Sequence, residues 1–384
     1  MNYSDNIEEI VYFDNAATSK PSRESVEAGV QEARLFGNPS SLHKIGFQAE
    51  QRLEEYRTAV GDSLYCSPDE ICFTSGGTEA NNLAIFGAAY KNRRKGNRIV
   101  STDSEHPSVN EALKRLEGEG FEVVRLSTIG GTLNMSEVEQ ALSEDTILVS
   151  VMHTNNETGA IYDVRAVSDL VRKKCPNAIM HCDCVQGYLK HRLSPKSLGV
   201  DLLSISSHKI CAPKGAGALY IKRGIHILPQ IVGGGQENGM RSGTESMMLI
   251  AAFAKAAKEG SLHLEENIEA VKKVREAILD GLSDISGITL NIADNPSPTI
   301  LSITVRANKS EVLLHKLSDR GIYVSSGSAC SSNSKRGKNS VLLAFGLTAT
   351  RADTTIRVSI NHTNTVAEAE RFCTALKEII KDGK

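Results

Sequence analysis

Lys209 lies just after the sequence LLSISSH, residues 202–208, which predicts a buried strand that ends in polar side chains. An ammonium group at the end of a buried strand is unfavourable unless it is paired or deprotonated. A lysine that forms a Schiff base would explain the position, and Ser206 and His208 beside it could donate hydrogen bonds to a phosphate. The alternative is a lysine whose long side chain carries its ammonium to the surface.

A second stretch, FTSGGTEANN at residues 73–82, predicts a strand, a turn of small residues and a helix that begins near Thr78. Gly76 and Gly77 would let the backbone approach a ligand closely. The free N–H groups at the helix N-terminus would attract a phosphate. The alternative is an ordinary turn followed by a helix N-cap.

Two further polar residues follow predicted strands. Asp183 ends the run NAIMHCD, and its carboxylate could keep a pyridinium nitrogen protonated. His106 follows IVSTDSE, and its flat ring could stack on a planar heterocycle or pass protons. The alternatives are an N-cap aspartate and a loop histidine that faces solvent. A phosphate cradle, an aspartate for a ring nitrogen, a stacking histidine and a Schiff-base lysine are the parts of a pyridoxal phosphate site.

These residues fall at the ends of short β-rich runs that alternate with helical patterns between residues 70 and 221. The alternation predicts an α/β fold around a mostly parallel sheet, which binds ligands beyond the C-terminal ends of its strands. A helical stretch at 246–283 would connect it to a smaller α+β domain. We therefore expect a large domain of residues 15–256 and a small domain of residues 1–14 and 257–384.

The composition is that of a globular protein of 384 residues, long enough for two domains. With 44 basic and 46 acidic residues, the chain has no charge excess that favours nucleic acid or an anionic membrane. The polar N-terminus argues against a secretory signal, and no apolar run reaches the roughly 20 residues of a membrane helix. The eight cysteines are too sparse for a disulfide scaffold, and Cys182 and Cys184 lack the second pair of a zinc site. We expect a cytoplasmic protein without a metal.

Short motifs occur along nearly the whole chain in the order found in one family. They are YFDNAATSKPS, NPSSLH, FTSGGTEANNLAI, EHPSV, NNETGAIYD, HCDCVQ, SSHKICAPKGAGALYI, GGGQENGMRSGT and SSGSACSS. On these motifs the chain resembles cysteine desulfurases of the NifS/IscS type, in the class V aminotransferase superfamily. The fold implied is that of the pyridoxal-phosphate-dependent transferases of fold type I.

The resemblance implies pyridoxal 5'-phosphate as the cofactor, joined to Lys209, with His106 stacked on its ring and Asp183 at its nitrogen. The other residues that match cofactor contacts are Gly77, Thr78, Asn156, Gln186, Ser206 and His208. Thr244, in MRSGT, matches a residue that reaches the phosphate of the neighbouring subunit. The resemblance therefore implies a homodimer.

The implied substrate is L-cysteine. Arg357, in TTIRVSI, would bind its carboxylate, with help from Asn38 and Asn156. An arginine fork suits a carboxylate because it donates two parallel charge-assisted hydrogen bonds. Without the resemblance, Arg357 could equally be an outward charge on an edge strand.

Cys330 would accept the sulfur. It lies in SSGSACSSNSKRGKNS, residues 325–340, whose cations favour the thiolate that attacks sulfur. Composition alone also fits a loop cysteine without a role. The resemblance implies that the freed Lys209 amine removes the substrate's α-proton and that the products are alanine and a persulfide on Cys330. The persulfide sulfur would pass to an iron–sulfur scaffold or another sulfur carrier.

Some positions depart from the family's pattern. Ser207 stands where glycine is usual, and Cys211 and Ala212 replace the usual Tyr-Gly before Pro-Lys-Gly. We expect these changes to keep the chemical groups but to alter access and rate. The rival hypotheses are a related class V enzyme, such as a selenocysteine lyase or an aminotransferase, and a non-enzymatic protein of the same fold. Cys330 favours desulfuration over transamination, which needs no thiol at that position.

Overall fold

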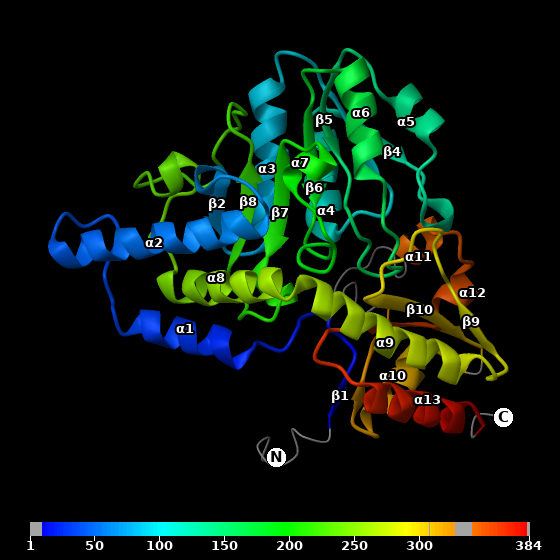
Figure 1. Cartoon of the computed structure of the whole chain (residues 1–384). Coiled ribbons are helices and arrows are strands. Elements are labelled where there is room, and N and C mark those ends of the chain that lie inside the picture. The colour runs from blue at the N-terminus through cyan, green and yellow to red at the C-terminus, as the bar shows by residue number, and fades with distance from the viewer. Residues whose placement is uncertain (1–9, 307, 327–339, 382–384) are drawn as a thin grey trace.

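The computed structural model describes residues 10–306, 308–326 and 340–381. Its larger sheet has seven strands in the order β2-β8-β7-β6-β5-β3-β4 (Figure 1). Their bounds are β2 (Ile71–Thr74), β3 (Arg98–Thr102), β4 (Glu122–Leu126), β5 (Thr146–Ser150), β6 (Ile179–Asp183), β7 (Leu202–Ser206) and β8 (Gly217–Ile221). Strand β8 is antiparallel to both neighbours, and the other paired strands are parallel. The predicted α/β fold with a mostly parallel sheet is confirmed.

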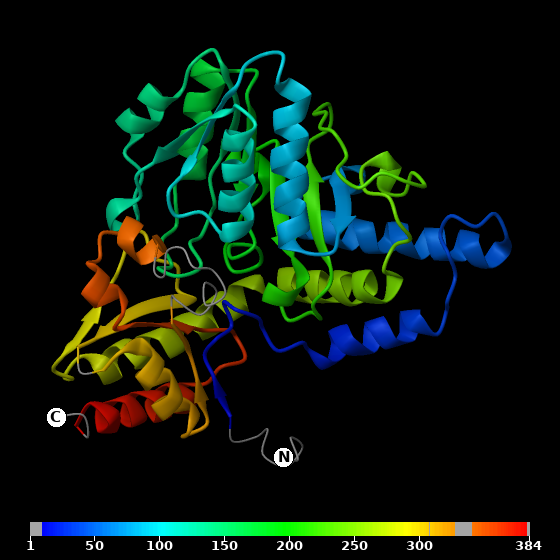
Figure 2. The ribbon, with the colours of Figure 1, turned by 180° about the vertical axis from the view of Figure 1, so that it is seen from behind.

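Helices cover both faces of this sheet, as apolar strands buried on both sides require. One face packs against α3 (Gly77–Asn92) and α4 (Pro107–Gly118), which stand in front of the sheet in Figure 2. The other face packs against α2 (Lys44–Ser63), α6 (Val164–Lys174) and α8 (Met247–Leu262). Two separate clusters of buried apolar side chains fill these interfaces and hold the strand ends in place.

A second, antiparallel sheet lies beside the first and has the strand order β12-β13-β10-β9 (Figure 1). Its strands are β9 (Ile288–Leu290), β10 (Ile300–Val305), β12 (Ser325–Ser326) and β13 (Thr355–Ser359). The helices packed against it are α9 (Leu264–Leu282), α10 (Ser310–Ser318) and α13 (Val366–Lys381). They form a further apolar cluster, which includes Ile278 and Phe372. A short parallel pair joins β1 (Val11–Tyr12) to β11 (Ile322–Tyr323).

The connection between the two sheets is helical. The predicted stretch at 246–283 forms two helices, α8 and α9, that meet at His263. The predicted domain bounds, 15–256 and 1–14 with 257–384, stay a prediction. The other helices are α1 (Arg23–Ala33), α5 (Met135–Ala141), α7 (Pro195–Leu198), α11 (Ser340–Ala344) and α12 (Ala349–Ala352). Within the described residues, no helix is long and apolar enough to cross a membrane.

The segment between β1 and α1 links the two sheets. Asn15 Nδ2 donates a hydrogen bond to the Ser359 carbonyl oxygen in β13 (2.9 Å). Further along the segment, the Ser19 N–H donates to the carbonyl oxygen of His208, just after β7 (2.9 Å). The backbone of this segment is therefore fixed next to the end of β7. Lys209, the predicted cofactor lysine, lies at that end.

Candidate active site

A cavity of about 460 Å³ opens at the C-terminal ends of β2, β3, β5, β6 and β7. Parallel strands end at the same edge of a sheet, so residues far apart in the sequence meet there. The predicted cofactor and substrate residues that line it are Gly77, Thr78, His106, Asn156, Asp183, Gln186, Ser206, His208, Lys209 and Arg357. Arg357 belongs to β13, so the second sheet also contributes to the cavity wall.

Asn38 and Thr244 are not among the described residues that line the cavity. Asn38 is exposed between α1 and α2, and its Oδ1 accepts a hydrogen bond from the Ser40 N–H (2.9 Å). Thr244 is exposed in the segment before α8. Neither is therefore a contact of the cavity in its own chain, as far as the described residues extend. Cys330 lies outside the described residues. The roles of all three stay predictions.

Lys209 ends a short 3₁₀ turn, Ser207–Lys209, that follows β7. Its Nζ donates hydrogen bonds to the carbonyl oxygens of Ala16 and Ala17, and the contact with Ala17 measures 2.7 Å. Carbonyl acceptors stabilise an ammonium that is withdrawn from water. The lysine therefore lines the cavity with a defined place for its amino group, which the segment after β1 supplies.

Asp183 is the last residue of β6 and is 5% exposed. Its Oδ2 accepts a hydrogen bond from Asn81 Nδ2 (2.7 Å), and its Oδ1 accepts one from the Val185 N–H (2.9 Å). Asn81 Nδ2 also donates to Ser108 Oγ (2.9 Å). The carboxylate is thus held by a turn and by α3 while it faces the cavity.

His106 is the N-cap of α4 and lines the same cavity. Its Nδ1 accepts a hydrogen bond from the Ser108 N–H (3.2 Å), which requires an unprotonated nitrogen there. Burial lowers the pKa of His106, and the positive charge of Lys209 lowers it further, while Asp183 opposes the shift. His106 is therefore a neutral imidazole on the cavity wall at neutral pH.

The N-terminus of α3 forms the cavity wall near β7. Gly76 is its N-cap with φ +155°, and Gly76, Gly77 and Thr78 all line the cavity. A Cβ atom on Gly77 would lie 2.7 Å from Val185 Cγ2, so a larger residue would require Val185 to shift. Ser206 Oγ is buried and has no hydrogen-bond partner among the described residues. Free N–H groups, a helix dipole and an unused hydroxyl together suit an anion such as phosphate.

His208 and Gln186 border the cavity beside Lys209. Burial, followed by the charge of Lys209, lowers the pKa of His208 to about 4, so its ring is neutral. Gln186 Nε2 donates to the Ala16 carbonyl oxygen (2.8 Å), and its Oε1 accepts from Lys190 Nζ (2.9 Å). The Gln186 amide is thereby oriented from both ends.

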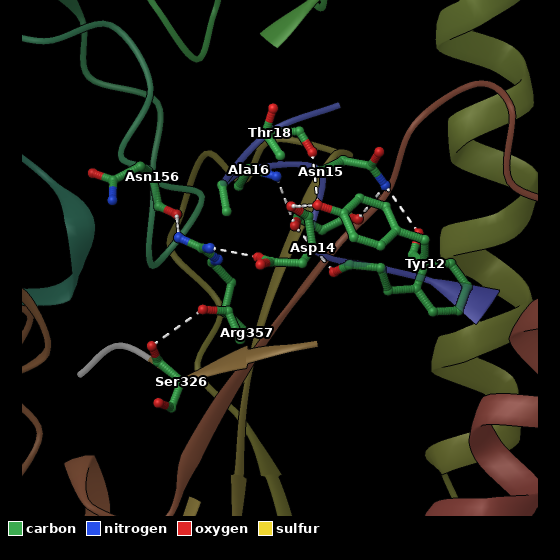
Figure 3. Close-up of polar contacts among 12 residues, drawn as sticks. Tyr12, Asp14, Asn15, Ala16, Thr18, Asn156, Ser326 and Arg357 are labelled. Atoms are coloured by element: carbon green, nitrogen blue, oxygen red, sulfur yellow. Dashed lines mark hydrogen bonds and ion pairs between the residues drawn. The ribbon is translucent and has the colours of Figure 1, made fainter. Parts of the chain in front are cut away.

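Arg357 and Asn156 meet at another part of the cavity wall (Figure 3). Arg357 Nη1 donates to the Asn156 carbonyl oxygen (2.9 Å), and Nη2 forms an ion pair with Asp14 Oδ1 (2.8 Å). In the described part of the chain, Arg357 Nε and Asn156 Oδ1 are buried without a hydrogen-bond partner. Buried polar groups are usually paired, so these two atoms indicate a polar ligand.

Several residues of the site were not predicted from the sequence. Asn81 lies three residues after Thr78, one helical turn along the same face, and that spacing could have identified it. The carbonyl groups of Ala16 and Ala17 carry no side-chain signal. Asp14 belongs to the motif YFDNAATSKPS. Its contact with Arg357 was not predictable, because it depends on the pairing of distant segments.

Two residues that depart from the family's pattern, Ser207 and Cys211, form hydrogen bonds with nearby residues. Ser207 Oγ donates a hydrogen bond to the Pro213 carbonyl oxygen (2.6 Å). Cys211 is buried, adopts φ +64°, and its Sγ lies 3.0 Å from Asn361 Nδ2. Neither residue is among the described residues that line the cavity.

The chain matches the model of the aminotransferase class-V family over residues 11–372. It belongs to this family. The chain is 36% identical to the cysteine desulfurase IscS of Methanosarcina thermophila over 376 residues, which are 97% of this chain and 92% of the relative. The predicted family is confirmed, and its enzymes depend on pyridoxal phosphate.

Solved structures show the same fold. A NifS-like protein superposes with a TM-score of 0.92 at 35% identity, covering 97% of this chain and all of the other. SspA, solved in complex with cysteine, superposes with a TM-score of 0.81 at 29% identity, covering 92% of this chain and 100% of that one. The class-V aminotransferase fold therefore extends over nearly the whole chain.

The cavity fits pyridoxal phosphate. The N-terminus of α3 and the unpartnered Ser206 Oγ suit a phosphate, and the Asp183 carboxylate suits a protonated ring nitrogen. Lys209 supplies the amine that this cofactor requires, and His106 offers a neutral aromatic ring. The group that the family implies thus matches the chemistry of the residues present.

Proposed function

We propose that this protein is a cysteine desulfurase that uses pyridoxal phosphate to convert L-cysteine into L-alanine and a persulfide on Cys330. The observation that carries the proposal is the meeting of Lys209, Asp183 and Arg357 in one cavity. It is supported by relatives that carry the name cysteine desulfurase and by a structural neighbour solved with cysteine.

Different cavity residues would contact different parts of the cofactor. Thr78, Ser206 and His208, with the N-terminus of α3 at Gly77, would hold the phosphate. When bound, the cofactor supplies an aldehyde that reacts with amines and a ring that withdraws electrons from the substrate. The other proposed contacts are Asp183 at the ring nitrogen, His106 on the ring face, and Gln186 and Asn156 near the ring hydroxyl.

Lys209 is the proposed base. Its amine takes the α-proton of the substrate and becomes an ammonium. The carbonyl oxygens of Ala16 and Ala17 already accept hydrogen bonds from Lys209 Nζ, so they stabilise that ammonium. We propose that His106, a neutral ring on the same cavity wall, passes protons.

Arg357 is the proposed carboxylate site. Its side chain is buried, and a guanidinium withdrawn from water forms strong charge-assisted hydrogen bonds with a carboxylate. Asn156, whose Oδ1 has no partner among the described residues, would assist at the same place. A role of Asn38 in this step stays a prediction.

Cys330 is the proposed sulfur acceptor, although it lies outside the described residues. It follows Ser326 by four residues, and Ser326 pairs with Ile356, the neighbour of Arg357 in β13. Its thiolate would attack the sulfur of cysteine, so that an S–S bond forms while the C–S bond breaks and the carbon fragment is protonated to alanine. The persulfide then serves a sulfur acceptor, which we propose to be an iron–sulfur scaffold or another sulfur carrier.

We also propose a homodimer, and the exposed apolar side chains at one end of the molecule support it. Phe36, between α1 and α2, is 81% exposed, and Val232, before α8, is 78% exposed. Both views place these two segments at the same end (Figures 1 and 2). Exposed apolar groups mark protein contacts where they form a contiguous patch. Thr244 lies in the second segment and would reach the partner's phosphate.

The proposed function is tested by mixing the cofactor-loaded protein with L-cysteine and a reducing thiol. We expect sulfide and L-alanine to appear in equal amounts. Sulfide without alanine, or 3-mercaptopyruvate from a transamination without sulfide, would contradict the proposal. A far higher rate with L-selenocysteine would instead favour the selenocysteine lyase hypothesis.

A further inference from the structure

Arg357 carries its charge in a buried position. Its side chain is 5% exposed, and that of Asp14, its ion-pair partner, is 23% exposed. A buried guanidinium is unfavourable without a counter-charge and hydrogen bonds. Asp14 supplies that charge at Nη2, and the Asn156 carbonyl oxygen accepts from Nη1. Contacts at both terminal nitrogens fix the plane of the guanidinium.

The guanidinium keeps donors for a ligand. It has five N–H donors, of which these two contacts use two. One of the others, at Nε, has no partner among the described residues. Arg357 lines the cavity, whereas Asp14 is not among the described residues that do. Asp14 therefore holds the guanidinium from outside the cavity and leaves the cavity side open to a carboxylate.

Asp14 is itself fixed by a turn. Its carbonyl oxygen accepts hydrogen bonds from the Ala17 N–H (3.0 Å) and from the Tyr12 hydroxyl (3.2 Å), as Figure 3 shows for Tyr12. Asp14 also forms a β-bridge with Ser359, two residues after Arg357 in β13. The same strand thus anchors both the aspartate and the arginine.

This turn also contacts Lys209. The carbonyl oxygens of Ala16 and Ala17, two and three residues after Asp14, accept hydrogen bonds from Lys209 Nζ. In an α-amino acid, one carbon atom separates the amine from the carboxylate. A single short segment therefore sets the distance between Lys209, which would carry the cofactor that receives the substrate's amine, and Arg357, which would bind its carboxylate.

We infer that Asp14 is a positioning residue, which holds the Arg357 guanidinium in register with Lys209 for the carboxylate of an α-amino acid. The inference rests on the proposed function, because it assigns the substrate carboxylate to Arg357. The opposite role would be that of a competitor, in which the Asp14 carboxylate occupies the site that the substrate needs. The two roles predict opposite effects on ligand binding.

The test uses Asp14→Ala and Asp14→Asn in the cofactor-loaded protein. Binding of L-alanine, the proposed product, is compared with binding of ethylamine, which has the same carbon chain without the carboxylate. Both dissociation constants are measured from the change in cofactor absorbance. For Asp14→Ala we expect L-alanine to bind about 10-fold more weakly, since a charge-assisted contact is lost, while ethylamine changes by less than about twofold. Asp14→Asn retains an acceptor oxygen, so its dissociation constant for L-alanine should lie between those of the wild type and Asp14→Ala.

A matched control is Asp69→Ala, which removes the carboxylate from an exposed pair with Arg223. It should leave both dissociation constants unchanged. Tighter binding of L-alanine by Asp14→Ala would identify a competitor and overturn the inference, and so would equal losses for both ligands, which indicate general damage. If Asp14→Ala does not fold, the same comparison is decided on Asp14→Asn. Failure of the wild-type protein to bind L-alanine would count against the proposed function itself.

Discussion

Replacement of Lys209 by alanine is expected to slow sulfide release from L-cysteine by about 1,000-fold or more, since a positioned general base alone contributes factors of this size. The substitution removes the amine that lines the cavity and that Ala16 and Ala17 hold in place. It leaves the phosphate and carboxylate sites intact. The variant should therefore bind the cofactor without a covalent bond and still bind L-cysteine.

Added methylamine should restore part of the Lys209→Ala activity, because a small amine can enter the space that the side chain leaves. A purely structural role for Lys209 would not allow such rescue. Lys222→Ala is the matched control, since Lys222 also follows a strand of the large sheet but pairs with Asp201 away from the cavity. Its activity should stay within about twofold of wild type, as is usual for a surface change. Retention of most of the activity by Lys209→Ala would contradict the proposed chemistry.

Replacement of Cys330 by alanine is expected to lower sulfide release to about one-hundredth of wild type or less, because the variant lacks the nucleophile that accepts sulfur. Its sequence neighbours Lys335, Arg336 and Lys338 favour a thiolate. The cysteines in the described residues are buried, apart from half-buried Cys66, so none of them offers an accessible thiol. Binding of L-cysteine, followed by cofactor absorbance, should persist.

Cys66→Ala is the control for this second prediction. Burial raises the pKa of Cys66 to about 12, so its thiol is protonated and a poor nucleophile at neutral pH. Its loss should leave sulfide release unchanged. Mass spectrometry of the wild-type protein after brief exposure to L-cysteine should find one extra sulfur atom on the peptide that carries Cys330. Undiminished sulfide release by Cys330→Ala would remove this residue from the mechanism and would favour another class V reaction.

The large sheet was predictable because its strands are short apolar runs bounded by turns and separated by amphipathic helices. Residues 98–102 and 217–221, for example, form β3 and β8 as their composition indicated. Asp183 and Lys209 were predictable for the same reason, since each follows directly after such a run. Parallel strands then bring their ends to one edge without further information.

Other features depend on contacts that local sequence does not encode. The amine of Lys209 meets backbone carbonyls, and Asp14 meets Arg357 across more than 300 residues of chain. The helical stretch at 246–283 gave no clear signal of the break at His263. Asn38 and Thr244 carry a predicted role, yet each is exposed in its own chain, and neither is among the described residues that line the cavity.

The central claim is that one amine, that of Lys209, carries the cofactor. Borohydride reduction of the loaded protein, followed by proteolysis and mass spectrometry, tests it most directly. We expect the reduced pyridoxyl group on the peptide that contains Lys209 and on no other lysine. A label on Lys190 or Lys214, or no labelled peptide at all, would contradict the account.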